Sequence, residues 1–212
     1  MPSLRQSLIA NALRMSGAGL NKGTAGNLSV RAEENGLHGF LITPTGMPYD
    51  ALQAEDIVFM HLDGTFAGRR KPSSEWRFHR DLYVARPEAG AIVHAHSPFA
   101  TSLACLRREI PPFHYMIARF GGSTLRCAAY ATFGSQALSD AALTALQGRN
   151  ACLLANHGLL VFGCDLAQAL DLAVELESLC EQYWRACQLG EPVVLNDDEM
   201  AIVLEKFAGY GQ

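Results

Sequence analysis

Long apolar runs and clusters of positive charge are both missing from this 212-residue sequence. No stretch approaches the roughly 20 apolar residues that a membrane-spanning helix needs, and residues 1–14 are polar and helix-like rather than typical of a signal peptide. The longest basic run is Arg69-Arg70-Lys71 and the formal net charge is -4, so the electrostatic footprint of a nucleic-acid binder is missing. We therefore expect a cytoplasmic protein that has neither a membrane nor a nucleic acid as its partner.

The spacing of the cysteines also argues against some kinds of site. The six cysteines form no Cys-x-x-Cys pair, and zinc-cysteine sites and disulfide frameworks need tighter spacing than theirs. Four of them have apolar neighbours that indicate core positions, so we interpret the cysteines as reduced and structural.

Apolar periodicity predicts interleaved helices and strands within one domain that spans residues 1–212. Helices are expected from Leu4 to near Gly17 and Gly19, and over residues 76–83, 98–107, 135–146, 166–189 and 197–207, with Ser73 or Ser74 as the N-cap of the second. Strands are expected over residues 27–32, 39–43, 57–62, 91–97 and 127–133, with a hairpin at Asp63-Gly64. The apolar stretch 151–162 is interrupted by Asn156-His157-Gly158 and therefore predicts two buried strands joined by a tight turn.

Three histidines form a candidate metal site. His94 and His96 are two residues apart on a predicted strand, so both imidazoles point to the same face and can chelate one ion. His157 lies in the polar turn between two apolar strands, where it could supply a third nitrogen. Taken alone, His157 is as consistent with an ordinary turn histidine, but beside the other two the ligand interpretation leads.

Glu75 allows two interpretations, because it stands at the start of a predicted helix. Its carboxylate could simply interact with the helix dipole. It could instead ligate a metal or exchange a proton with a carbon acid, and both of these roles require a closeness that sequence does not reveal.

Three segments rich in Gly, Ser and Thr could donate hydrogen bonds to a phosphate. They are Gly23 to Asn27, Thr43 to Gly46, and Ser73-Ser74. Each of them alone is explained by ordinary turn or cap chemistry. Their combination with three candidate metal ligands favours a phosphorylated substrate.

Taken together, five motifs resemble the class II aldolase/adducin family in order and in spacing, over nearly the whole chain. They are Gly23 to Ser29, Ile42 to Gly46, Pro72 to Glu75, His94 to His96, and Asn156 to Gly158. Phe113 to Met116, Tyr130 to Gly134 and Glu205 to Gly211 are most similar to the branch that cleaves L-fuculose 1-phosphate. The resemblance implies a three-layer α/β fold whose central mixed, mostly antiparallel sheet is covered by helices, in a homotetramer with active sites between subunits.

The resemblance also implies a role for each site residue. His94, His96 and His157 would ligate one divalent ion per subunit, usually zinc, with manganese or cobalt as alternatives; Glu75 would bind it in the empty site and otherwise handle a proton. Tyr115 from a neighbouring subunit would exchange a proton with the aldehyde oxygen. The phosphate would be surrounded by Thr24, Asn27, Thr43, Gly46, Ser73 and Ser74. Phe133 and Phe207 would form an apolar wall for the aldehyde, and Tyr210 would orient it.

The implied reaction is reversible cleavage of a ketose 1-phosphate such as L-fuculose 1-phosphate into dihydroxyacetone phosphate and a small aldehyde. Ala95 and Ala155 depart from the fuculose pattern, so a 5-deoxy- or 5-methylthio-ribulose 1-phosphate is equally admissible. A pentulose-5-phosphate 4-epimerase shares the retro-aldol step, but such enzymes have Asp where this chain has Glu75. A non-catalytic adducin-like module is a more distant alternative, and the presence of all three histidines, Glu75 and Tyr115 argues against it.

Overall fold

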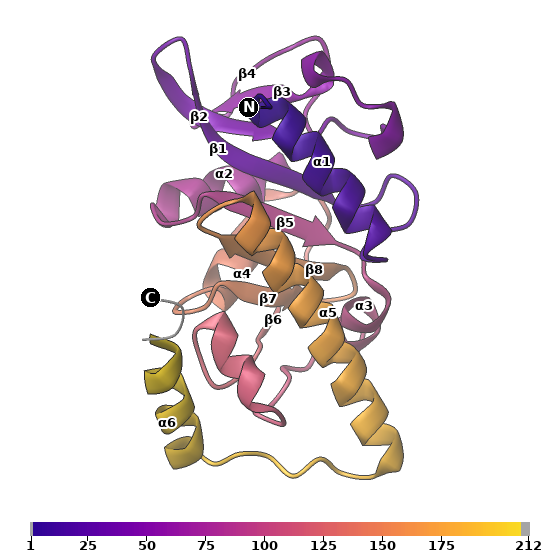
Figure 1. The fold of residues 1–212 in the computed structure, drawn as a ribbon, viewed down its shortest axis with the longest axis vertical. Coiled ribbons are helices and arrows are strands. Elements are labelled where there is room, and N and C mark those ends of the chain that lie inside the picture. The colour runs from indigo at the N-terminus through magenta and orange to yellow at the C-terminus, as the bar shows by residue number, and fades with distance from the viewer. Residues whose placement is uncertain (1, 209–212) are drawn as a thin grey trace.

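The computed structural model describes residues 2–208, and an eight-stranded β-sheet forms the centre of that part of the chain (Figure 1). The strand order is β4-β3-β2-β1-β5-β8-β7-β6. All neighbours pair antiparallel except β6 and β7, which pair parallel. The strands are β1 (Asn27–Glu34), β2 (Leu37–Ile42), β3 (Val58–His61), β4 (Phe66–Ala67), β5 (Ala91–Ala95), β6 (Cys127–Ala128), β7 (Ala151–Leu154) and β8 (Gly158–Gly163).

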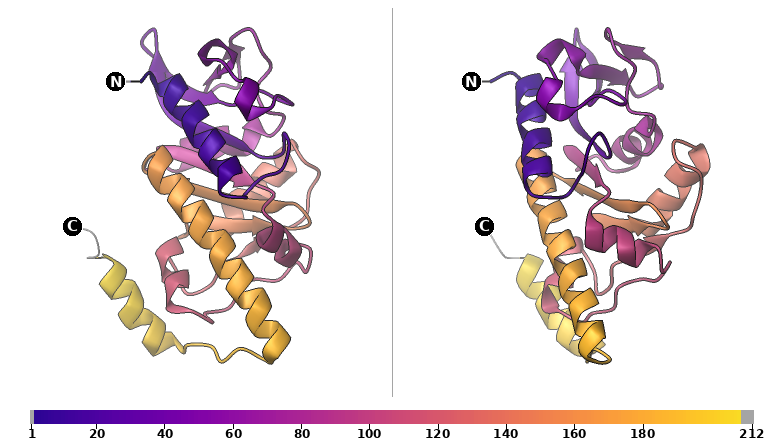
Figure 2. Two further views of the ribbon diagram at one scale, coloured as in Figure 1. Left: turned by 45° about the vertical axis from the view of Figure 1, so that its right-hand side comes forward. Right: turned by 90° about the vertical axis from the view of Figure 1, so that its right-hand side faces the viewer.

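Helices cover both faces of this sheet and make three layers, as the side view in Figure 2 shows. One face carries α1 (Leu4–Gly17), α3 (Pro98–Ala104) and α5 (Leu166–Leu189), and the other carries α2 (Trp76–Ala85) and α4 (Gln136–Ala145). The 3-10 helix η3 (Tyr115–Phe120) contacts α6 (Asp197–Ala208), which follows an extended segment after α5. The predicted mixed, mostly antiparallel sheet covered by helices is therefore confirmed.

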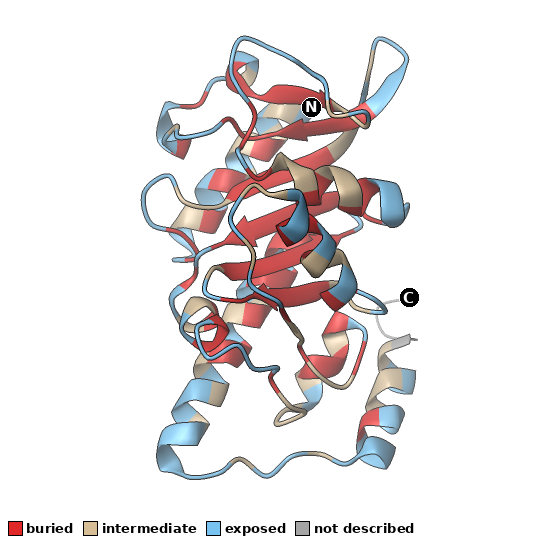
Figure 3. Ribbon diagram, turned by 180° about the vertical axis from the view of Figure 1, so that it is seen from behind, coloured by how far each residue is buried: buried red, intermediate tan, exposed pale blue. Residues whose placement is uncertain are grey.

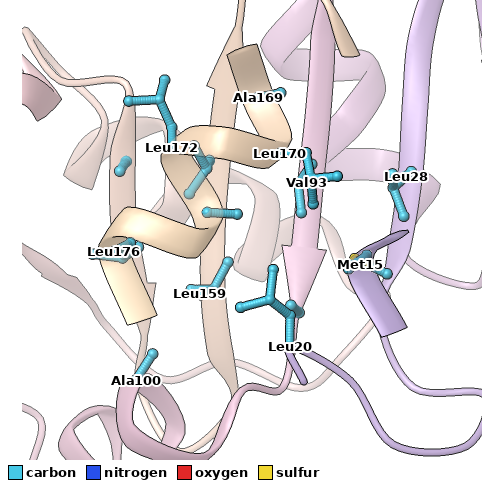
Figure 4. Packing of buried hydrophobic residues seen from close by; sticks show 14 of the residues in the cluster. Met15, Leu20, Leu28, Val93, Ala100, Leu159, Ala169, Leu170, Leu172 and Leu176 are labelled. Atoms are coloured by element: carbon cyan, nitrogen blue, oxygen red, sulfur yellow. The ribbon is translucent and has the colours of Figure 1, made fainter. Parts of the chain in front are cut away.

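Strand alternation divides the interior into two cores. Successive side chains of a strand point to opposite faces, and accordingly Ala91 and Val93 of β5 pack with α1 and α5 while Ile92 packs with α2 and α4. Figure 4 shows the first of these cores, where Val93 lies close to Leu170 of α5. The strands at the middle of the sheet are buried on both faces, as the red ribbons of Figure 3 show. This alternation directs His94, two residues after Ile92, towards the α2 side.

Two local predictions were wrong. The strand expected over residues 127–133 covers only Cys127–Ala128, because the chain then turns away from the sheet and contributes Tyr130 and Phe133 to a cavity. The predicted serine cap of α2 is also absent. Glu75 holds the N-cap position, and no side chain makes a cap hydrogen bond there. Ser73 Oγ instead accepts from the backbone N–H of Glu75 at 3.3 Å, before the helix begins.

The cysteines differ in part from expectation. All six are free, but only Cys152 and Cys180 are fully buried, rather than four. Three of the others are exposed: Cys105, Cys164 and Cys187. They lie at or near the ends of α3, β8 and α5, where the neighbouring apolar side chains face the core but the cysteine side chains do not. Between residues 2 and 208, no helix is long and apolar enough to cross a membrane.

Candidate metal centre and cavity

Four side chains from three parts of the fold converge at one end of the central strands. His94 lies on β5, His96 directly follows that strand, His157 lies in the turn between β7 and β8, and Glu75 immediately precedes α2. The antiparallel pairing of β5 with β8 brings Ala95 opposite Leu159, so the turn that carries His157 reaches the end of β5. Sheet topology therefore assembles a cluster whose members are up to 82 residues apart in sequence, from Glu75 to His157.

The donor atoms of this cluster face one another. The His94 Nε2 atom lies 3.0 Å from His96 Nε2 and 3.0 Å from Glu75 Oε2, and His157 Nε2 lies 3.1 Å from Glu75 Oε1. The three ring centroids are 4.7 to 4.9 Å apart, with interplanar angles of 74 to 76°. All four possible ligand atoms lie within 4.8 Å of one another. The three ring planes are thus steeply inclined to one another around a common point.

Hydrogen bonding supports a cation at that point. His94 Nδ1 lies 2.8 Å from the carbonyl oxygen of Leu159, which can only accept, so Nδ1 carries the ring proton. The Nε2 atom of His94 therefore faces the Glu75 carboxylate at 3.0 Å, where a shared proton or a metal ion would hold the two together. Three imidazoles with one carboxylate are a donor set that suits a divalent ion such as zinc.

The pKa shifts of Glu75 and His96 favour the protonation states in which these side chains can bind a cation. Burial acts to raise the pKa of Glu75, but the charge of His94 and hydrogen bonds from His157 and His94 outweigh it and hold that pKa well below its usual value. Burial, followed by the charges of His94 and His157, lowers the pKa of His96 to about 4. Near neutral pH the carboxylate is therefore ionised and His96 is an uncharged ligand.

A cavity of about 350 Å³ opens beside this cluster. Its lining includes Glu75, His96, His157 and residues from all three of the Gly/Ser/Thr-rich segments: Thr24, Ala25, Gly26, Asn27, Pro44, Thr45, Gly46, Ser73 and Ser74. The rest of the lining is Tyr130, Ala131, Phe133 and Asn156. The cavity therefore combines many hydroxyl and backbone groups with two aromatic side chains, beside the candidate metal ligands.

Gly26 allows the first of these loops to pass close to the histidines. Its φ of +74° lies in the left-handed region, and a Cβ there would stand 2.1 Å from Asn21 Nδ2 and 2.6 Å from the His94 carbonyl oxygen. Asn21 Oδ1 in turn accepts from the His96 N–H at 2.8 Å. The loop, Asn21 and the backbone of His96 thus form one packed unit.

Most of the predicted phosphate residues line the cavity, and Thr43 lies just behind it. Thr43 is buried, and its Oγ1 accepts from the Leu28 N–H at 3.3 Å. This contact joins the start of β1 to the end of β2, next to Asn27 and Thr45. The phosphate-binding role of all these residues remains a prediction.

The predicted aldehyde residues are placed less uniformly. Phe133 lines the cavity, but Tyr115 and Phe207 are not among its described lining residues. Their rings lie together on η3 and α6, with centroids 6.5 Å apart, and Tyr115 is half exposed. Tyr210 lies outside the described residues. An exposed tyrosine that does not line the cavity of its own chain is the arrangement expected if it serves the site of another subunit.

His79 is a residue at this site that the sequence analysis left without a role. It is fully buried on α2, and its Nε2 lies 2.5 Å from Asn27 Oδ1. A pattern that could have identified it is its spacing of four residues from Glu75, which places both on one side of a helix start. Instead, its position among Phe78, Leu82 and Tyr83 made it look like part of an ordinary core face.

Comparisons with known proteins agree with this architecture. Residues 6–184 match the family model described as class II aldolase and adducin N-terminal domain. The chain is 56% identical over 209 residues to a 5-methylthioribulose-1-phosphate/5-deoxyribulose-1-phosphate aldolase of Rhodospirillum rubrum, covering 99% of this chain and 93% of that protein. It is 47% identical over 209 residues to an L-fuculose phosphate aldolase of Escherichia coli, covering 98% and 95%.

A solved structure of an L-fuculose 1-phosphate aldolase superposes with a TM-score of 0.91 at 42% identity and covers 98% of each chain. These similarities extend through the sheet, the helices and the segments that carry the candidate ligands. The chain belongs to the class II aldolase and adducin family.

Proposed function

We propose that this protein is a divalent-metal-dependent aldolase that cleaves a ketose 1-phosphate into dihydroxyacetone phosphate and a small aldehyde. The observation that carries the proposal is the convergence of three histidines on the Glu75 carboxylate beside a cavity whose lining is rich in hydroxyl groups. A structural role alone would not gather three imidazoles and a carboxylate within 4.8 Å of one another, because burying polar groups costs free energy.

Each residue has a distinct task in this mechanism. His94, His96 and His157 hold the ion, for which zinc is our first choice, and when bound it supplies positive charge that stabilises the anion left by carbon–carbon cleavage. In the condensation direction Glu75 removes a proton from C3 of dihydroxyacetone phosphate; in cleavage it returns that proton to the same carbon. Ionisation of Glu75 in the resting site is consistent with the first role.

The polar residues of the cavity lining bind the phosphate in this proposal. Thr24, Asn27, Gly46, Ser73 and Ser74 lie at its surface, and Thr43 supports two of the loops from behind. No lysine or arginine lines the cavity among the described residues, so hydroxyl, amide and backbone N–H groups provide the binding.

Tyr115 acts in the site of a neighbouring subunit, where its hydroxyl donates a proton to the aldehyde oxygen in condensation and its phenolate takes the proton of the C4 hydroxyl in cleavage. The half-exposed position of Tyr115, away from the cavity of its own chain, supports this assignment. It requires an oligomer, and a homotetramer is the assembly that we propose. Six free thiols suit the reducing conditions of the cytoplasm, where we place the enzyme.

Two groups of substrates are candidates, and they differ in the end group of the aldehyde. L-fuculose 1-phosphate would release an aldehyde that carries a hydroxyl, whereas 5-deoxy- and 5-methylthio-ribulose 1-phosphate would release aldehydes that do not. The identity of 56% to the Rhodospirillum rubrum enzyme, against 47% to the Escherichia coli fuculose enzyme, favours the ribulose derivatives. Phe133 at the cavity supplies an apolar surface for such an end group.

The test is release of dihydroxyacetone phosphate from L-fuculose 1-phosphate, 5-deoxyribulose 1-phosphate and 5-methylthioribulose 1-phosphate, at equal concentrations of zinc-loaded protein. We expect release from all three, with kcat/KM highest for a ribulose derivative. A parallel incubation with ribulose 5-phosphate tests for epimerisation at C4. Epimerisation without release of dihydroxyacetone phosphate from any ketose 1-phosphate would contradict the aldolase proposal.

A further inference from the structure

A chain of buried hydrogen bonds runs from the Glu75 carboxylate into the interior behind it. Asn27 Nδ2 donates to Glu75 Oε2 at 3.1 Å, and Asn27 Oδ1 lies 2.5 Å from His79 Nε2. His79 Nδ1 lies 2.7 Å from Ser29 Oγ, which lies 2.8 Å from the Tyr83 hydroxyl. Asn27, Ser29, His79 and Tyr83 are each no more than 3% exposed. No water is needed to complete the chain.

Antiparallel pairing explains why these residues meet. Asn27 of β1 is directly opposite His94 of β5, and opposed residues in a ladder point to the same face. Ser29 is two residues further along β1 and so shares that face, which α2 covers with His79 and Tyr83. These hydrogen bonds therefore connect the candidate metal centre to α2 through Asn27 and Ser29, at the start of β1.

The placement of the Asn27 amide fixes the direction of every bond. Its Nδ2 lies 3.1 Å from Glu75 Oε2 and its Oδ1 lies 2.5 Å from His79 Nε2, so the NH₂ group donates to the carboxylate and the oxygen accepts from His79. His79 must then carry its proton on Nε2, which leaves Nδ1 as an acceptor for the Ser29 hydroxyl. Ser29 in turn accepts from Tyr83. Reversing one bond would reverse all of them and would set the Asn27 oxygen against the carboxylate.

His79 is well suited to remain uncharged in this position. It is completely buried, and burial, followed by the positive charge of His94, lowers its pKa to about 3. A neutral imidazole has one donor and one acceptor on opposite sides of the ring, which matches the acceptor oxygen of Asn27 and the donor hydroxyl of Ser29. An apolar residue of the same size would leave the Asn27 oxygen buried without a donor.

From this geometry we infer that His79 is a positioning residue, which holds the amide of Asn27 so that its NH₂ group faces Glu75 and the cavity. One N–H of that group binds Glu75 Oε2, and the second remains available at the cavity surface where Asn27 lies. Asn27 thereby ties the position of the acid–base carboxylate to that of the phosphate-binding loop. The catalytic consequence rests on the proposed function, whereas the orientation of the amide does not.

The imidazole tautomer gives a direct test that needs no activity. Nitrogen-15 NMR of histidine-labelled protein at neutral pH, with the His79 signals assigned by their loss in His79→Gln, should show a proton on Nε2 and a bare, hydrogen-bonded Nδ1. A proton on Nδ1 of His79 would overturn the inference, because Asn27 would then have to turn its oxygen towards Glu75.

Two substitutions at His79 separate positioning from packing. The amide of glutamine reaches about as far as Nε2 and can still donate to Asn27, whereas the shorter asparagine ends near Nδ1 and cannot. Loss of an outer partner of a metal site typically costs 10- to 100-fold, so we expect His79→Asn to lower kcat by roughly that factor and His79→Gln to lower it by only about threefold. Leu82→Ala, a cavity-forming change on the same helix, serves as the control for stability and should leave kcat of the folded protein unchanged.

Binding measurements distinguish failure of this inference from failure of the proposed function. Inorganic phosphate should bind the zinc-loaded His79→Asn protein at least about tenfold more weakly than wild type, and zinc itself should still bind at one ion per chain. If wild type cleaves no ketose phosphate but phosphate binding shows this pattern, the inference holds without the aldolase. Equal phosphate affinity and equal kcat in His79→Asn and wild type would overturn it, as would an equal loss of both in Leu82→Ala.

Discussion

Glu75 makes direct contacts with several other residues of the candidate site. Its two carboxylate oxygens lie within 3.1 Å of two histidines, and one of them also accepts from Asn27. The sequence could predict His94 and His96 as a pair, because residues two apart on a strand share a face. His157 joined them because it lies in a polar turn between two apolar strands, whereas the role of Glu75 stayed open until the resemblance to a family, since its closeness to the histidines depends on the fold. His79 was missed because its polar partners come from β1, a different element.

Acid should destabilise the metal-free protein through His79. Its pKa in the folded protein is about 3, against an ordinary value of 6.5, so between these values the unfolded chain binds a proton that the folded chain does not. The stabilisation is complete above pH 6.5 and is lost as pH falls towards 3, with a slope approaching about 1.4 kcal/mol per pH unit from this group. His96, whose pKa is about 4, adds in the same direction.

Urea unfolding of metal-free protein between pH 7 and pH 4.5 measures this effect. His79→Gln should show a shallower loss of unfolding free energy than wild type, because one of the two groups no longer titrates. His38→Gln, at an exposed side chain, is the matched control and should keep the wild-type slope. Parallel curves for wild type and His79→Gln would contradict the neutral, buried state of His79.

At the scale of elements, hydrophobic periodicity predicted most helices and strands with nearly the observed bounds. It overestimated β6, because Tyr130 and Phe133 follow the sequence pattern of a strand but belong to a loop at the cavity. It also assigned a serine cap to α2, whereas the hydroxyl of Ser73 binds the backbone just before the helix. Both errors fall beside the cavity, where side chains serve the site rather than the regularity of the element.

The junction between β5 and α3 depends on a residue of α5. Glu177 accepts from Ser97 Oγ at 2.6 Å and from the N–H groups of Phe99 and Ala100 at 2.8 Å each. Ser97 directly follows the candidate ligand His96. The carboxylate thus holds the start of α3 and, with it, the end of the strand that carries two histidines.

Replacing this carboxylate should therefore be costly. Because hydrogen bonds to a charged group contribute about 1.5–3 kcal/mol, we expect Glu177→Ala to lower the free energy of unfolding by roughly 2–3 kcal/mol in urea titrations. Glu175→Ala, two residues away on α5, removes a partly exposed contact to Arg119 at 3.4 Å and should cost less than about 0.5 kcal/mol. Similar losses in both variants would show that Glu177 has no special role at the junction.

For the whole molecule, the resemblance gave the sheet and its covering helices, and the structure confirms them. Composition and periodicity alone could not give the strand order, because β1 pairs with β5 across more than 50 residues of chain. The proposed assembly depends on Tyr115, which is half exposed and is not among the described residues that line the cavity of its own chain. The intersubunit site therefore remains a proposal.

Mixing two inactive variants tests this assembly. His94→Ala lacks a metal ligand but keeps Tyr115, whereas Tyr115→Phe has the reverse defect. If each site combines histidines of one subunit with the tyrosine of another, then random reassembly from equal amounts should make about one quarter of the sites complete. Dihydroxyacetone phosphate release should recover to about that fraction of wild type after the two are dissociated and reassembled together. Each variant reassembled alone is the control, and absence of recovery in the mixture would mean that both residues act within one subunit.

The central claim is that the cluster of Glu75 and three histidines makes this protein a metal-dependent aldolase. Its most direct test is titration of chelator-treated protein with zinc while dihydroxyacetone phosphate release from 5-deoxyribulose 1-phosphate is followed. Activity should be absent at the start, should rise linearly, and should reach a plateau at about one ion per chain, with no rise in His94→Ala. Full activity in the metal-free protein, or an equal rise in His94→Ala, would contradict the account.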